Sequence, residues 1–149
     1  MKLPRGLVVS CQARADNPLH GPRFMGAMAL AARDGGAVGI RANGPADIAA
    51  VQAAGLPVIG IHKVFADDVP VYITPNFEAA AAIYASGAGI VALDCTERPR
   101  HGEHPSVLIR RIQEEIGAEV FADISTLDEG LKAADWGADY VATTLSGYT

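Results

Sequence analysis

Six nearly continuous apolar runs alternate with helical segments along the chain, and this alternation restricts the possible fold more than any other feature. The runs contain apolar and small residues with little regular alternation of polar side chains. Such runs are typical of strands that are covered on both faces, as in a parallel sheet. The expected strands are Gly6–Gln12, Ala37–Ala42, Val58–Lys63, Ile90–Thr96, Glu119–Ser125 and Tyr140–Ser146.

The segments between these runs have the start and stop signals of helices. Proline at a first helical position, or an Ser/Thr-x-x-acid pattern such as that of residues 125–129, begins a helix, and glycine ends one. A Gly-Ala pair precedes three of the strands, at Gly36, Gly87 and Gly137, which is typical of repeated βα units wound with one hand. The expected helices are Pro22–Arg33, Pro45–Ala54, Phe77–Ser86, Ser106–Ile116 and a last one that ends before Gly137; Val71–Pro75 is expected to extend the loop after the third strand.

Composition limits the class of protein. The chain has 149 residues, of which 50% are hydrophobic and 19% charged, and its formal net charge is −5. These values predict a single domain over residues 1–149 with a real core, and they exclude a disordered chain. An acidic balance argues against nucleic acid or an anionic membrane as the main partner.

Location can also be predicted from the sequence. The beginning of the chain resembles no signal peptide, and no apolar run reaches the length of a membrane-spanning helix. Cys11 and Cys95 lie inside strand-like segments, so we expect two reduced core thiols in a cytoplasmic protein.

Six strands leave two architectures open. A doubly wound open sheet would be complete at this length. A (β/α)₈ barrel needs two more units and typically about 250 residues. Periodicity does not choose between them.

Polar residues follow the carboxyl ends of the expected strands, where parallel α/β folds bind their ligands. The simplest explanation is that strand ends become polar where they emerge from the core, but Lys63, Arg41, Asp94 and Asp123 together favour a site. A lysine that ends a buried strand beside a cationic neighbour such as Arg41 is a candidate general base. The polar ends are Ser10 to Gln12, Arg41, His62 and Lys63, Asp94, Asp123 to Ser125, and Thr143 to Ser146.

Two roles are open for the aspartates. Asp94 and Asp123 could accept hydrogen bonds from substrate hydroxyls, or they could hold the lysine and arginine in place. The alternative is a ring of internal ion pairs with no catalytic role. We expect the stem of Lys63 to be buried and its amine to point toward Arg41 and Asp123.

The other apparent motifs give little information about function. The glycines around Gly87 enter a strand instead of leaving one, so they do not form a dinucleotide-binding fingerprint. His101 and His104 lack the helical spacing of a metal site, and we expect a solvated loop there and no metal. His20 lies on a turn-rich loop over the same end of the sheet, where it could contact substrate. Cys95 is expected to be a packed thiol.

Seven stretches, in order from one end of the chain to the other, resemble the N-acetylmannosamine-6-phosphate 2-epimerase family of (β/α)₈ enzymes. They are GLVVSCQ at residues 6–12, GGAVGIRAN at 35–43, PVIGIHK at 57–63, ITP at 73–75, ALDCT at 92–96, ADIST at 122–126 and TTLSGYT at 143–149. The resemblance implies a phosphate-binding barrel in sialic-acid catabolism.

The resemblance also implies a site. The family's catalytic lysine falls on Lys63, its aspartate on Asp123, its arginine on Arg41 and its glutamine on Gln12. The implied reaction inverts C2 of an open-chain amino sugar phosphate by removing and returning the proton beside the C1 aldehyde, which converts N-acetylmannosamine 6-phosphate to N-acetylglucosamine 6-phosphate and back. Such proton transfer needs a tuned base and support for an enolate, but no metal or redox cofactor. We therefore expect Lys63 and Asp123 to be catalytic, and the expected substrate-binding residues are Gln12, Arg41, Asp94, Thr144 and Ser146.

The sequence departs from the family in two ways. The family continues for two more βα units, which carry a glutamate at the end of the seventh strand and a glycine-rich phosphate site, whereas this sequence ends at Thr149. We therefore expect an incomplete barrel with impaired activity. His62 also stands beside the lysine where an apolar residue is expected.

Two other functions remain open. Lys63 could form a Schiff base in another phosphate-sugar barrel enzyme, such as an aldolase. The chain could also be a non-catalytic truncated barrel that acts as an oligomeric binding module. In each case the open strand edges predict a homo-oligomer or a complementing C-terminal segment.

Overall fold

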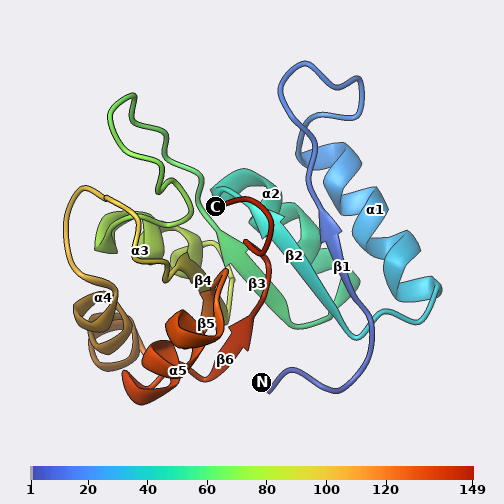
Figure 1. Ribbon diagram of the computed structural model, residues 1–149. Helices are drawn as coiled ribbons and strands as arrows, with labels where there is room; N and C mark the ends of the chain where they lie inside the picture. Colours follow the sequence, from blue (N-terminus) through green and yellow to red (C-terminus); the bar gives the residue numbers. More distant parts are fainter. Residues whose placement is uncertain (1) are drawn as a thin grey trace.

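Six parallel strands lie side by side in the order of the chain and curve into an open half-barrel (Figure 1). The computed structural model describes residues 2–149. A doubly wound sheet reverses its strand order at a switch point, whereas this order runs from β1 to β6 without reversal, as in a (β/α)₈ barrel. The strands are β1 (Val8–Cys11), β2 (Gly39–Asn43), β3 (Val58–Ile61), β4 (Ile90–Asp94), β5 (Glu119–Asp123) and β6 (Tyr140–Ala142).

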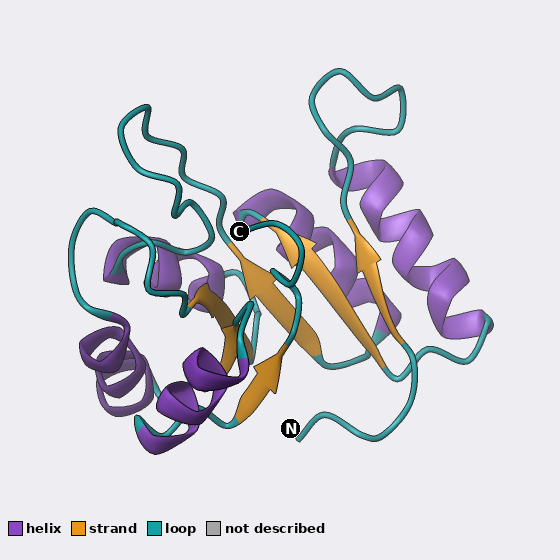
Figure 2. Ribbon diagram, in the orientation of Figure 1, coloured by secondary structure: helices purple, strands orange, loops and turns teal. Residues whose placement is uncertain are grey.

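The helices cover the convex face of this sheet, and the concave face is left to the strands and loops (Figure 2). Each strand is joined to its parallel neighbour by a crossover connection, as parallel pairing requires. The architecture is therefore the predicted α/β barrel, present here as six of its units. The helices are α1 (Pro22–Asp34), α2 (Pro45–Val51) with the 3₁₀ turn η1 (Gln52–Ala54), α3 (Phe77–Ala85), α4 (Pro105–Arg111) with the π turn η2 (Ile112–Ile116), and α5 (Leu127–Asp135).

The predicted helix boundaries hold for chemical reasons. Thr126 caps α5, and Glu129 completes a capping box with it, as the sequence pattern predicts. Gly87 and Gly137, which follow α3 and α5, have positive φ angles of 108° and 96°, a conformation that costs glycine little. These Gly-Ala pairs thus mark the points where α1, α3 and α5 turn back toward the next strand.

All six strands are shorter than the expected ranges, and two segments differ most. β6 ends at Ala142 rather than at Ser146, because the chain then turns and packs Leu145 onto the concave face of the sheet. Residues 62–74 fold back as a hairpin, in which Lys63 pairs with Ile73 in an isolated antiparallel bridge. Ile73 thereby joins the inner core and its carbonyl oxygen accepts a hydrogen bond from the Asp94 backbone.

Side chains alternate between two cores along each strand. Ile40 and Ala42 belong to the larger core between sheet and helices, and Arg41 between them faces the concave side. The smaller core lies on the concave side and includes Ile59 and Ile61 of β3. Polar residues that alternate with helix-facing residues near the strand ends are therefore directed to the concave side.

The segment before β1 crosses the amino end of the sheet. The backbone N–H of Leu3 donates a hydrogen bond of 3.1 Å to the Tyr140 hydroxyl of β6, and Leu3 packs against the inner core. This contact joins the two ends of the half-barrel at its base. Between residues 2 and 149 no helix is both long enough and apolar enough to cross a membrane.

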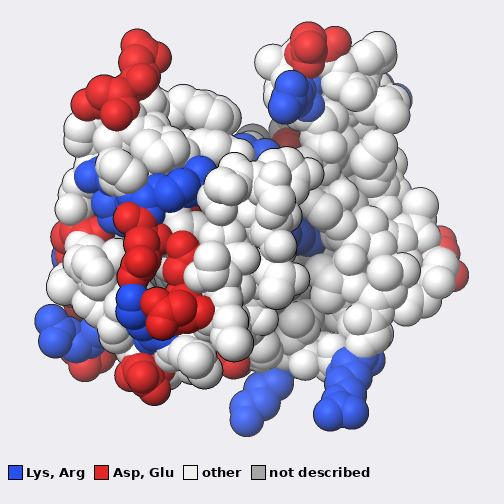
Figure 3. Space-filling model, in the orientation of Figure 1, with Lys and Arg blue, Asp and Glu red and all other residues white. Residues whose placement is uncertain are grey.

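Both ends of the sheet expose apolar surface. β1 pairs only with β2 and β6 only with β5 among the described strands, so one edge of each is unpaired. Leu127, Leu131 and Val141 are 80%, 58% and 44% exposed beside β6, and Leu7 is 63% exposed beside β1. Between these two ends the face seen in Figure 3 is hollowed and carries few charged side chains, which gather instead on the side of α4 and α5.

A polypeptide of these 149 residues is therefore expected to self-associate. Unpaired edges flanked by exposed apolar side chains are normally covered or paired, because both features favour contact with another chain. Sedimentation velocity over a range of concentrations should show dimers or larger species, and amides of β1 and β6 should gain protection from hydrogen exchange as the concentration rises. A stable monomer in which both edges are already protected would contradict this expectation.

Candidate active site

The carboxyl ends of the strands bring the predicted polar residues to one end of the concave face. Ser10 pairs with Arg41 across β1 and β2, and Asp94 pairs with Asp123 across β4 and β5. Residues two apart on a strand share a face, so Gln12 follows Ser10 on the same side. Two long loops, residues 12–21 and 62–76, rise beyond this end of the sheet (Figure 1).

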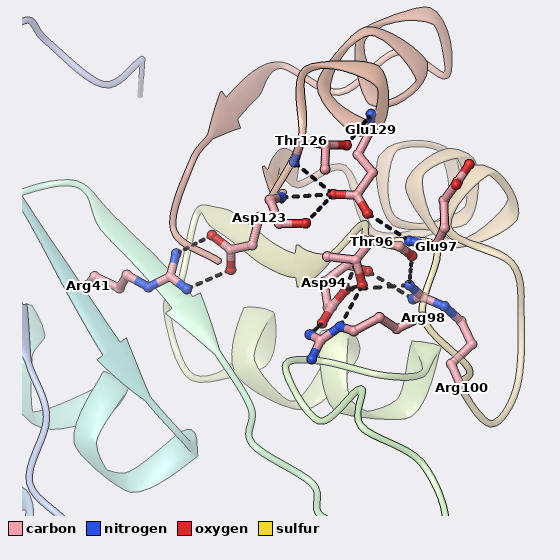
Figure 4. A network of polar contacts seen from close by, with 10 residues as sticks. Arg41, Asp94, Thr96, Glu97, Arg98, Arg100, Asp123, Thr126 and Glu129 are labelled. Carbon is pink, nitrogen blue, oxygen red and sulfur yellow. Dashed lines mark hydrogen bonds and ion pairs between the residues drawn. The ribbon is translucent and has the colours of Figure 1, made fainter. Parts of the chain in front are cut away.

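Arg41 and Asp123 form a buried ion pair that spans the concave face from β2 to β5 (Figure 4). Arg41 Nη1 donates to Asp123 Oδ1 at 3.0 Å, and Nη2 donates to Oδ2 at 2.6 Å. Their side chains are 11% and 0% exposed, and the guanidinium also lies over the Phe121 ring, 5.7 Å from its centroid. Two parallel bonds fix the plane of the guanidinium, so Asp123 holds the arginine in place.

Asp94 organises the loop that follows β4 (Figure 4). Its Oδ1 accepts hydrogen bonds from the Thr96 backbone at 2.9 Å and from the Thr96 hydroxyl at 2.7 Å. Its Oδ2 accepts one from Arg98 at 2.7 Å, and Arg100 donates to the Asp94 backbone oxygen at 2.8 Å. Both carboxylate oxygens of Asp94 thus accept hydrogen bonds from the loop after β4. Contact between Asp94 and substrate remains a prediction.

Lys63 lies half-buried in a cavity of about 770 Å³ at the mouth of the half-barrel. Its backbone N–H donates to Asn43 Oδ1 at 2.9 Å, while its ammonium has no carboxylate partner within 4.0 Å among residues 2–149. Burial, and then the positive charges of Arg41 and Arg14, lower the pKa of Lys63. Lys63 is therefore near Arg41, as expected, but Asp123 pairs with the arginine and not with the lysine.

The lowered pKa predicts an unusual labelling order among the lysines at residues 2, 63 and 132. An amine reacts in its neutral form, so a lowered pKa raises the reactive fraction at any pH below that of an ordinary lysine. Hydrogen bonds to Asp128 and Glu97 raise the pKa of Lys132 instead. In trace acetylation followed by peptide mass spectrometry, the pH profile of Lys63 should lie below that of Lys132; a profile at or above it would contradict this prediction.

Gln12 presents an unused acceptor to the site. Its Nε2 donates to the Ser10 hydroxyl at 2.8 Å, which fixes the orientation of the amide. Its Oε1 is buried and has no hydrogen-bond partner. Because an unpaired buried oxygen is costly, this atom is suited to accept a hydrogen bond from a bound hydroxyl or amide group.

Thr144 and Ser146 lie in the turn after β6 rather than at the end of a longer strand. Both are exposed, and between them Leu145 anchors the turn through its buried side chain and a 3.1 Å backbone bond to Ile124. The turn brings the end of the chain to the carboxyl ends of the strands (Figure 1). The roles of Thr144 and Ser146 in substrate binding remain predictions.

Several residues that the sequence alone did not indicate line the cavity around Lys63. The hairpin after β3 contributes Phe65 and Tyr72, whose rings stack with centroids 4.7 Å apart. The sequence could have indicated Phe65 and Tyr72 as cavity residues only through their position after a polar strand end, because the hairpin that carries them was not expected. The other such residues are Arg14, Asn43 and Asp47.

The histidines after β4 have structural partners. His101 Nε2 lies 2.8 Å from Asp68 Oδ1 and links two surface loops, and His104 caps α4 by accepting a hydrogen bond from the Ser106 backbone. The side chains described for residues 2–149 include no group of three or more His, Cys, Asp or Glu that could hold a metal ion. Cys11 and Cys95 are buried free thiols, and burial raises the pKa of Cys95 to about 12, which fits a packed thiol rather than a nucleophile.

Glu129 ties the loops after β4 and β5 together (Figure 4). One of its oxygens accepts hydrogen bonds from the Ser125 backbone, the Ser125 hydroxyl and the Thr126 backbone, at 2.8, 2.7 and 3.0 Å. The other accepts from the Glu97 backbone at 3.1 Å. This buried carboxylate thus fixes the loops that follow Asp94 and Asp123.

Glu129→Ala should therefore lower the free energy of unfolding by about 1–3 kcal/mol, because it leaves backbone donors without partners. Urea denaturation measures this change. Glu78→Ala is the matched control, since Glu78 also lies in the first turn of a helix but is exposed, and it should change stability by less than about 0.5 kcal/mol. Equal losses in the two variants would show that the network does not stabilise the fold.

Comparison with known proteins places this geometry in one family. Residues 25–149 match the family model described as "Putative N-acetylmannosamine-6-phosphate epimerase". Curated relatives named "Putative N-acetylmannosamine-6-phosphate 2-epimerase" include one from Synechococcus elongatus, 52% identical over 99% of this chain and 65% of its own length. Another, from Clostridioides difficile, is 49% identical over 99% of this chain and 67% of its own length.

A solved structure agrees with these relatives. The N-acetylmannosamine-6-phosphate 2-epimerase from Clostridium perfringens superposes with a TM-score of 0.91 and 44% identity, over 95% of this chain and 62% of that one. The chain thus spans about two thirds of the length of the proteins it matches. On this evidence, the chain belongs to the N-acetylmannosamine-6-phosphate 2-epimerase family.

Proposed function

We propose that this chain carries the proton-abstracting part of an amino-sugar phosphate 2-epimerase, which interconverts N-acetylmannosamine 6-phosphate and N-acetylglucosamine 6-phosphate. The observation that carries the proposal is Lys63, a half-buried amine with a lowered pKa in a cavity at the carboxyl end of a barrel sheet. The lowered pKa raises the neutral fraction of this amine above that of an ordinary lysine, so Lys63 is better able to act as a base.

The surrounding residues support the charge that the reaction creates. Removal of the C2 proton beside the C1 aldehyde gives an enolate, which needs oriented donors and positive charge. Arg41 donates two of its N–H groups to Asp123, and the ion pair fixes the orientation of the guanidinium. Its other N–H groups are available to donate hydrogen bonds to the enolate. The free Oε1 of Gln12 is available for a hydroxyl or the acetamido N–H of the sugar. Because proton transfer is redox-neutral, we propose no cofactor.

Inversion of C2 also needs a proton donor on the opposite face. Asp123 has both oxygens bound to Arg41, so it serves that role poorly in this arrangement. The family resemblance implies a glutamate from a seventh strand, and the relatives extend beyond the part matched here. We therefore propose that a segment carrying the seventh and eighth βα units, together with self-association, completes the site.

Deuterium exchange tests this proposal. In heavy water, N-acetylmannosamine 6-phosphate should gain deuterium at C2 when the chain is mixed with a segment that supplies the last two units, and N-acetylglucosamine 6-phosphate should appear. The aldolase alternative predicts instead a covalent adduct on Lys63 after borohydride reduction. Adduct formation without C2 exchange would replace the epimerase proposal with that alternative.

The two cysteines indicate the cellular compartment in which the enzyme works. Cys11 and Cys95 are free and buried, which suits a reducing compartment, and we propose that the enzyme works in the cytoplasm.

A further inference from the structure

His20 has a fixed protonation pattern at the rim of the cavity that holds Lys63. Its Nδ1 lies 2.9 Å from the backbone oxygen of Ala13. A carbonyl oxygen only accepts, so Nδ1 carries the proton and donates it. The neutral ring therefore keeps Nε2 as its basic nitrogen, and His20 lines the cavity together with Lys63.

Asp47 stands within electrostatic range of this ring. It lies in the first turn of α2, is half-buried, lines the same cavity, and makes no ion pair or side-chain hydrogen bond among residues 2–149. Burial raises the pKa of the Asp47 carboxyl, and the charge of His20 opposes that rise. The Asp47 carboxyl group and the His20 ring are therefore close enough to interact electrostatically.

The proposed reaction needs a step for which the residues described so far provide no group. An aldose with a free C5 hydroxyl closes to a pyranose in water, and its C2 proton is acidic only when C1 is an aldehyde. Ring opening must therefore precede proton transfer at C2. It requires a base for the C1 hydroxyl proton and a proton for the ring oxygen.

Resting on the proposed epimerase function, we propose that His20 is the acid–base residue that opens the pyranose ring of the substrate. Nε2 takes the proton of the C1 hydroxyl, the O–H electron pair forms the C1 carbonyl, and the bond from C1 to the ring oxygen breaks. The ring oxygen takes a proton from a water molecule, and the resulting hydroxide takes the proton from the imidazolium. His20 returns to its neutral form, and no atom or charge is left over.

Four charged residues that the sequence placed at this end of the sheet have other roles. Lys63 is needed at C2, and the guanidinium of Arg41 does not release its proton. Both oxygens of Asp123 bind Arg41, and those of Asp94 bind the loop after β4. Among these groups, His20 combines a free basic nitrogen with a fixed tautomer and a neighbouring carboxyl group.

Anomer exchange measures ring opening without any chemistry at C2, so it can be tested on the 149-residue chain. Exchange NMR between the α and β anomers of N-acetylmannosamine 6-phosphate gives the rate with and without protein. The chain should accelerate the exchange, and His20→Gln should lower the catalysed part by about 10²-fold, as is typical for loss of an acid–base group. His101→Gln is the matched control, because His101 is 61% exposed, pairs with Asp68 and does not line the cavity that holds Lys63, and it should leave the rate unchanged.

Further measurements separate the outcomes. A phosphorus chemical-shift titration should give similar substrate affinity for the wild-type chain and His20→Gln, and amide spectra should show the same fold. Asp47→Asn should also slow the exchange, by about tenfold, because it removes the negative charge near the ring that takes up the proton during the step. No acceleration by the wild-type chain, or full acceleration by His20→Gln, would overturn the role of His20.

The epimerase proposal fails in a different experiment. If anomer exchange is catalysed and depends on His20 but C2 gains no deuterium in the completed protein, His20 opens the ring and the epimerase proposal is wrong. If C2 exchange occurs at full rate in His20→Gln, the epimerase proposal stands and His20 does not open the ring.

Discussion

A polypeptide of these 149 residues should epimerise N-acetylmannosamine 6-phosphate at least about 10²-fold more slowly than the same polypeptide combined with a segment that supplies the seventh and eighth βα units. Loss of one general acid or base typically costs about 10²–10⁴-fold in rate. The family's glycine-rich phosphate site also lies in that segment by resemblance, so binding energy that would position the sugar is lost as well.

The structure gives this segment a place to bind. The unpaired edges of β1 and β6 are free to pair with further strands in a sheet that already runs in barrel order, and exposed Leu131 and Val141 flank one edge. The rate can be followed by NMR of C2 and by appearance of N-acetylglucosamine 6-phosphate. The segment alone serves as control, and rapid epimerisation by the 149-residue polypeptide without it would contradict the expectation.

Asp123→Asn should lower the free energy of unfolding by about 3–5 kcal/mol. The change removes the carboxylate charge opposite Arg41, whose side chain is only 11% exposed, and leaves a buried cation without a partner. Urea denaturation measures the loss, and a cost below about 1 kcal/mol, as for a surface pair, would contradict the role of this ion pair in the fold.

A double variant separates stability from function. Arg41→Met combined with Asp123→Leu replaces both charges with apolar side chains, and such replacements of buried pairs are often close to neutral. We expect the double variant to be more stable than Asp123→Asn, yet to have no measurable C2 exchange in the completed protein. Restored exchange would show that neither charge is needed for the reaction.

Much of the fold could be predicted from the sequence, because the signals are local. Continuous apolar strands, proline and glycine at helix ends and the capping box at Thr126 each act within a few residues, and the structure confirms them. The choice between a barrel and a doubly wound sheet rests on strand order, which periodicity does not reveal, so the family resemblance decided it. The end of β6 was misplaced because burial of Leu145, a tertiary contact, turns the chain after Ala142.

The candidate site was predictable only in part, for a similar reason. Strand ends place Arg41, Lys63 and both aspartates at one end of the sheet, but the partner of each charge depends on how the sheet curves. Asp123 reaches Arg41 across the concave face, whereas Asp94 is taken by Arg98 and Arg100 of its own loop. The hairpin that carries Phe65 and Tyr72 gave no recognisable sequence signal.

The most direct test of the central claim, that Lys63 removes the C2 proton, is deuterium exchange at C2 with Lys63→Gln in the completed protein. We predict a loss of about 10²–10⁴-fold relative to the unaltered protein. Lys132→Gln is the matched control, because Lys132 is a surface lysine paired with Glu97 and Asp128, and it should retain the full rate. If Lys63→Gln exchanges the C2 proton as fast as Lys132→Gln, Lys63 is not the base and the account is wrong.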